Sequence, residues 1–183
     1  MTSETLSIRE VQRNASGNRD ELLLALCEEL TSQVGNAMRI SYRAEGAWVD
    51  GVRAALYELL AFLDASPTLA RLLIVGSGAV NTGVLAQRGR VLDMLACALE
   101  ADSPSAAIGS LPAPFGADAV VAAVASVLHA RLADESAPLL RELRGPLMAV
   151  IVLSYLGADA ARDELLRSPP PREGGCELDR MLQ

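Results

Sequence analysis

Apolar residues recur at every third or fourth position along most of this 183-residue chain. The clearest run places five of them four positions apart, namely Leu22, Leu26, Leu30, Val34 and Met38. Because an α-helix turns once every 3.6 residues, this spacing predicts a long amphipathic helix, with Asn18 as its N-cap because acidic residues follow it. No segment shows the alternation typical of a strand, so the sequence predicts an all-α fold.

The same period continues beyond this first helix. Further helices are predicted within 48–67, 67–75, 81–102, 118–134, 138–156 and 158–167. Pro67 is expected in the first turn of its helix, and Pro146 is expected to kink or loosen the helix over 138–156 by removing a backbone donor. The segment 102–117 holds three prolines and is predicted to be a loop.

The stretch RLLIVGSGAVNTG at 71–83 raises the question of a dinucleotide-binding loop. Gly76 and Gly78 fit the first two positions of GxGxxG, but Asn81 stands where the third glycine belongs. A parallel sheet cannot be built from one candidate strand, and lone glycine motifs are often accidental. The stretch therefore predicts a break between two helices, where small residues allow close packing.

Composition limits the classes of function. Apolar residues make up 51% of the chain and aromatic residues only 3%, which predicts a core of Leu, Val and Ala. The net charge of −7 argues against a general nucleic-acid or anionic-membrane surface. The three cysteines are far apart, and no CxxC or HxxxH spacing joins them to the single histidine, so no metal or other cofactor is predicted.

No residues form an evident catalytic constellation, and we predict that the protein is not an enzyme. His129 is expected in mid-helix, either partly buried and hydrogen-bonded to a neighbour or facing a cavity as a polar ligand contact. Cys27 and Cys97 are expected to be small core side chains. The N-terminus lacks an apolar signal core and the apolar stretch 146–157 is too short to span a bilayer, so a cytoplasmic location is expected.

The order of several motifs is more informative than any one residue. The chain carries a tryptophan-led helix that ends in FLDASP, then ARLL, and later YLG before an alanine-rich short helix. In this order, residues 18–167 resemble the C-terminal effector and dimerisation domain of the tetracycline-repressor (TetR/AcrR) family of bacterial transcriptional regulators. The resemblance implies a helical bundle whose middle helices enclose a mostly apolar ligand pocket, and a four-helix bundle formed with a second copy.

Homodimerisation is therefore the expected assembly. The predicted helices at 118–134 and 138–156 carry more apolar surface than a small monomer easily covers, and Ala119, Ala122, Ala123, Ser126 and Ala130 leave one face small enough for close helix approach. The predicted dimer contacts are Val120, Ala123, Val124, Val127, Leu143, Leu147, Val150, Ile151 and Tyr155.

The implied ligand is a small, neutral and apolar molecule. Its contacts are sought on helices around 38–62, 73–94 and 121–129, where apolar bulk is mixed with a few hydrogen-bonding groups. The predicted ligand contacts are Met38, Tyr57, Phe62, Leu73, Ser77, Met94, Leu95, Ser126 and His129.

The N-terminus departs from the family pattern. Family members normally begin with a three-helix DNA-binding unit, whereas residues 1–17 offer a remnant of one such helix or a disordered arm, and residues 168–183 are predicted to form a mobile tail. Without a recognition helix, direct DNA binding is not expected. The hypotheses are a ligand-binding regulator whose DNA contact is weak, altered or borrowed from a full-length relative as a heterodimer, and a stand-alone small-molecule binding or sequestering dimer with no role in transcription.

Overall fold

A computed structural model describes residues 3–75, 82–104, 116–134 and 139–167 of the chain. Its elements are α1 (Ser3–Ala44), α2 (Trp48–Ala65), α3 (Pro67–Ile74), α4 (Thr82–Ala101), α6 (Ala117–Ala133), the 3₁₀ helix η1 (Leu140–Leu143), α7 (Arg144–Leu156) and α8 (Ala158–Leu166). No strand occurs in these residues, which confirms the predicted all-α class. Gly76, Gly78, Asn81 and the tail at 168–183 lie outside the described residues.

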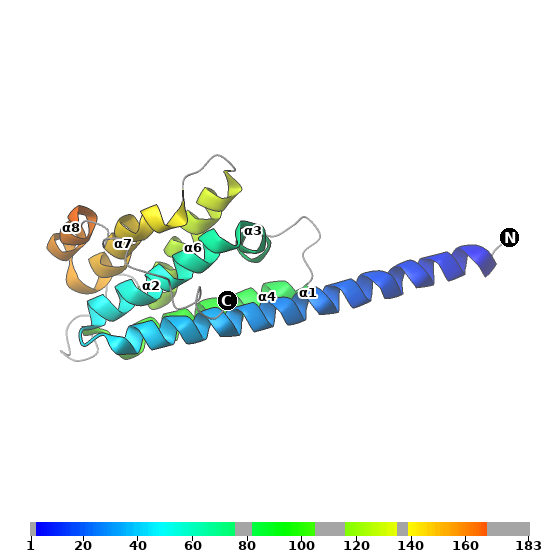
Figure 1. The fold of residues 1–183 in the computed structure, drawn as a ribbon, viewed down its shortest axis with the longest axis horizontal. Helices are drawn as coiled ribbons and strands as arrows, with labels where there is room; N and C mark the ends of the chain where they lie inside the picture. The colour runs from blue at the N-terminus through cyan, green and yellow to red at the C-terminus, as the bar shows by residue number, and fades with distance from the viewer. Residues whose placement is uncertain (1–2, 76–81, 105–115, 135–138, 168–183) are drawn as a thin grey trace.

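Helix α1 is one continuous helix of 42 residues. At 1.5 Å per residue it is about 63 Å long, and its N-terminal part extends beyond the other described helices (Figure 1). Asn18 lies inside it, so the predicted N-cap there is wrong. The segment from Ser3 to Asn18 contains no proline that would interrupt the hydrogen bonds of the helix.

The remaining helices form a bundle around one apolar core. Helix α2 packs along α1, α6 packs against α3, α4 and α7, and α7 packs against α2 and α8. The largest fully buried side chains are Leu60, Leu147, Met148, Val152 and Cys27. Phe62 is the aromatic residue among the buried members of the core, in agreement with a core of mainly aliphatic side chains.

The two prolines expected in helices both lie in first turns. Pro67 opens α3, as predicted. Residues 140–156 form η1 followed directly by α7, and Pro146 is the third residue of α7. The first-turn N–H groups of a helix have no acceptor within the helix, so a proline at this position removes no hydrogen bond.

Asp64 fixes the start of η1. Its Oδ1 accepts a hydrogen bond of 2.7 Å from the backbone N of Leu140, and its Oδ2 accepts bonds of 3.1 and 3.0 Å from the backbone N and Nε of Arg141. These bonds satisfy two N–H groups at a helix start and attach the last turn of α2 to η1. No local pattern in the sequence indicates this contact, because Asp64 and Leu140 are 76 residues apart.

Gly51 lies where α2 crosses the end of α1. A Cβ at this position would lie 2.9 Å from Cδ2 and 3.0 Å from the carbonyl oxygen of Tyr42. Because a backbone oxygen cannot rotate away, we expect Gly51→Ala to lower the free energy of unfolding by about 1–3 kcal/mol, measured by urea denaturation. In the control Gly89→Ala, a Cβ meets nothing within 4 Å in the middle of α4. The free energy of unfolding of Gly89→Ala is expected to rise by about 0.5–1 kcal/mol. An equal decrease in the two variants would contradict the close contact at Gly51.

Candidate functional site

The residues predicted to line a ligand pocket differ in their burial. Phe62 is buried in the core, and Met38 is partly buried against it. Tyr57, Leu73 and Leu95 are also partly buried, whereas Met94, Ser126 and His129 are exposed and Ser77 lies outside the described residues. The Oγ of Ser126 donates to the carbonyl oxygen of Ala122 in its own helix at 2.8 Å.

The histidine and one cysteine differ from their expected environments. His129 is exposed, because α6 turns the adjacent Leu128 into the core and a helix rotates its side chains by about 100° per residue. Cys27 is buried, as expected, and desolvation raises the pKa of its thiol. Cys97 is exposed on α4, so its expected place in the core is wrong.

An aromatic pair joins the start of α2 to the end of α7. Trp48 is the first residue of α2 and Tyr155 is the penultimate residue of α7. Their ring centroids are 5.1 Å apart and the ring planes are inclined by 59°, a tilted arrangement favourable for aromatic rings. We use the name aromatic corner for three residues, Trp48, Tyr155 and Glu100. Glu100 is included because, in addition to burial, its negative charge raises the pKa of Tyr155.

Two polar atoms of the aromatic corner are buried without a partner. Trp48 Nε1 and Tyr155 Oη have no hydrogen-bond partner among the described residues, as is also true of Arg131 Nε on α6. Most buried polar side-chain atoms in folded proteins have one, and leaving such a group unpaired costs about 1–3 kcal/mol. The pair therefore has unused hydrogen-bonding capacity at an interface between two helices.

Two carboxylates, those of Glu100 and Asp102, act on the two phenols at this end of the bundle. Burial raises the pKa of Tyr155, and the charge of Glu100 raises it further. Nearby, Tyr42 Oη donates to Asp102 Oδ2 at 3.1 Å, and burial followed by this hydrogen bond raises the pKa of Tyr42. Both phenols therefore remain protonated through the neutral range and can act as hydrogen-bond donors. Figure 1 shows that the ends of α1 and α7 meet the start of α2 away from the projecting part of α1.

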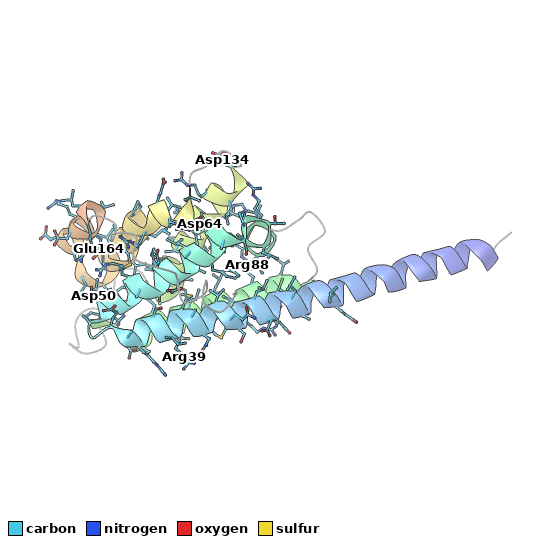
Figure 2. All side chains as sticks on the ribbon, in the orientation of Figure 1. Arg39, Asp50, Asp64, Arg88, Asp134 and Glu164 are labelled. Carbon is cyan, nitrogen blue, oxygen red and sulfur yellow. The ribbon has the colours of Figure 1, made fainter. Side chains whose placement is uncertain are left out.

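A charged cluster beside the aromatic corner attaches α8 to α2. Arg53 forms a two-fold contact with Glu164, with Nε to Oε2 at 3.0 Å and Nη2 to Oε1 at 2.5 Å, and it also pairs with Asp50. Figure 2 shows Asp50 and Glu164 at the same end of the bundle. The pKa of Arg53 is raised, chiefly by its bond to Glu164, whereas desolvation and the charge of Arg53 lower the pKa of Arg144. These contacts account for a structural role of the cluster.

The predicted dimer contacts divide into buried and outward groups. Val120, Leu147 and Ile151 lie in the core of the single chain, so this arrangement does not present them to a partner. Val124, Leu143, Val150 and Tyr155 are partly buried, and Ala123 and Val127 are exposed. Six of the exposed residues of α6 form what we call the uncharged α6 face, composed of Ala119, Ala122, Ala123, Ser126, Ala130 and Ala133; Asp118, Val127 and His129 are exposed on the same helix beside this face.

Two other kinds of site were sought in the described residues. No group of three or more His, Cys, Asp or Glu side chains is arranged to hold a metal ion in this part of the chain. Among the helices described, none is long and apolar enough to cross a membrane.

A scan against protein-family models, a search of curated proteins and a search of solved structures found no match to the chain. The resemblance to TetR-type regulators therefore rests on the motifs in the sequence and stays a prediction.

Proposed function

We propose that the chain is a homodimeric, small-molecule-binding regulator of the TetR type, assembled through α6 and α7. The observation that carries this proposal is the uncharged α6 face. Charged residues make up 21% of the chain, yet six of the nine exposed positions of α6 hold only alanine and serine, and Asp118 is the one acidic residue among the other three. A helix face that is permanently in water has no physical need to exclude charge in this way.

A second copy of the same face is a suitable partner. Small side chains let two helix axes approach to about 8 Å, and a two-fold axis places identical patches against each other. Leu153 of α7 is half-exposed, and α7 packs against α6, so apolar side chains are available beside the alanine face. Burial of Leu153 and Val127 in the dimer would add hydrophobic stabilisation that the alanines alone cannot supply.

The proposed regulation is a population shift. A ligand that fits one arrangement of the helices better than another would tilt α3 and α4 relative to the dimer bundle, and a ligand that fits both equally would change nothing. Helix α4 packs against α6, so such a tilt would change the packing of one of the proposed dimer helices. Direct reading of DNA by this chain is not part of the proposal.

The test is to place a charge at the centre of the uncharged α6 face. We expect the wild-type chain to be a dimer at micromolar concentration, and Ala123→Glu to raise its dissociation constant by about two orders of magnitude or more, because an unpaired buried carboxylate costs about 3–5 kcal/mol. Sedimentation equilibrium measures both constants.

Ala86→Glu is the matched control, because Ala86 is an exposed helical residue of α4 and the new carboxylate would have Arg90 four residues later. It is expected to leave the dimer unchanged. A monomeric wild type, or equal weakening by both substitutions, would contradict the proposed assembly.

A further inference from the structure

The two unpartnered atoms of the aromatic corner specify what could complete it. The indole Nε1 of Trp48 is only a donor, and the phenol of Tyr155 is a donor as well as an acceptor. Both needs are met by an oxygen that accepts hydrogen bonds. Such an oxygen on a small molecule would restore bonds whose absence is unfavourable in a buried place, so binding would be stabilised by satisfying groups the protein already holds in position.

Electrostatics decides between acceptors of different charge. Carboxylate and phosphate oxygens are strong acceptors, but an anion at this place would be repelled by Glu100, whose charge already acts on the Tyr155 phenol. Asp102, bonded to Tyr42 at the same end of the bundle, adds a second negative charge. A carbonyl oxygen of an amide or ketone accepts hydrogen bonds without bringing a charge.

The surrounding rings favour an apolar body on the same molecule. Trp48 and Tyr155 are both partly buried and packed against the hydrophobic core, as is Leu99 one residue before Glu100. Their inclined rings give apolar surfaces next to the two donors, the combination by which proteins commonly hold small ligands.

We infer that the aromatic corner binds a small uncharged molecule that has an aromatic or aliphatic body and a carbonyl oxygen accepting from Trp48 Nε1 and Tyr155 Oη. This ligand class is the one we assign to the proposed regulator. Binding at the corner does not depend on the proposed function, but a regulatory effect of that binding does. Trp48 and Tyr155 belong to α2 and α7, so a molecule held between them contacts a helix of the proposed dimer bundle.

Trp48 makes the test direct because it is the only tryptophan in the chain. The probes are benzamide, which is neutral and has a carbonyl, benzoate, which has nearly the same shape and a negative charge, and ethylbenzene, which has no acceptor. With excitation confined to tryptophan, benzamide is expected to change the emission of Trp48 saturably, with an affinity at least about tenfold higher than that of either other probe.

Tyr155→Phe removes one proposed donor and keeps the ring. We expect it to weaken benzamide binding by about tenfold with little effect on the folded state, since the hydroxyl it removes has no protein partner. Thr31→Val is the control, because it removes a hydroxyl of α1 that donates to the carbonyl oxygen of Cys27 in its own helix at 2.6 Å, and it should bind benzamide as the wild type does.

Three results would overturn the inference: no saturable change with benzamide, equal binding of benzoate, or an unchanged affinity in Tyr155→Phe. The first is the result expected if only water completes the corner. This experiment is separate from the dimer test. A monomer that binds benzamide would support the corner and contradict the dimer, and a dimer that binds no probe would do the reverse.

Discussion

Removal of the Glu164 carboxylate by Glu164→Ala is expected to lower the free energy of unfolding by about 3 kcal/mol or more. The Glu164 side chain is only 6% exposed and that of Arg53 only 13%, and the two form paired hydrogen bonds between α8 and α2. Without Glu164, the guanidinium keeps Asp50, which is about half exposed, and stays close to the charge of Arg144. The cost is mainly that of a buried cation left without its principal partner.

A second ion pair in the same helix provides the control. Arg162 and Asp159 also pair, at 3.3 Å, but their side chains are almost fully in water. Because water and salt screen such pairs, Asp159→Ala should leave the unfolding midpoint unchanged within error. Urea denaturation followed by circular dichroism, at one protein concentration for all variants, measures both effects.

The double replacement Arg53→Met with Glu164→Leu separates pairing from packing. Replacing both partners of a buried pair by apolar residues of similar volume is often neutral. Recovery of most of the stability lost in Glu164→Ala would show that the loss came from the unpaired charge. A double variant as unstable as Glu164→Ala would contradict this explanation.

The helices were predictable from sequence because their signal is local. The helical period that starts with Trp48 and Val52 predicts the start of α2, and the proline at position 67 predicts the start of α3. Each signal lies within a few residues of the helix start that it predicts, and both helices begin there. The start of α1 was not predictable in this way, because Asn18 has the features of an N-cap but the residues before it are equally able to be helical.

The contacts that hold the bundle together have no local signal. Arg53 and Glu164 are 111 residues apart, and Asp64 and Leu140 are 76 residues apart. Each of these charged residues, read alone, is typical of a solvated helix face. Their roles depend on how helices are placed against each other, and one sequence does not contain that information.

The exposure of the predicted site residues also depends on how helices are placed, through the rotation of each helix about its axis. Ser126, Leu128 and His129 all belong to α6, yet Leu128 is in the core and the other two face solvent. The aromatic corner was missed because Trp48 and Tyr155 belong to helices far apart in the sequence, α2 and α7. The one available signal was their scarcity, because the chain has one tryptophan and three tyrosines.

Two leucines of α7 test the distinction between core and dimer surface. Leu147 was predicted to contact a second copy, but it is fully buried in the core of the single chain, whereas Leu153, six residues later, is 48% exposed. We expect Leu147→Ala to lower the free energy of unfolding by about 2–5 kcal/mol, because it removes buried methyl groups and leaves a cavity. Urea denaturation measures this change.

Leu153→Ala should weaken the dimer and leave the unfolding of the single chain nearly unchanged. Its side chain contributes little to the core of one chain, so the unfolding of the monomeric Ala123→Glu background should change by less than about 0.5 kcal/mol. In the otherwise wild-type chain it should weaken the dimer, since burial of a leucine against a partner contributes about 1.5–3 kcal/mol when complete. Because the same substitution is made in the same helix, a difference in kind between the two variants can arise only from which way each leucine faces. If Leu147→Ala weakened the dimer and left unfolding unchanged, the core assigned to α7 would be wrong, and the periodicity of the sequence would have identified the dimer face better than the structure does.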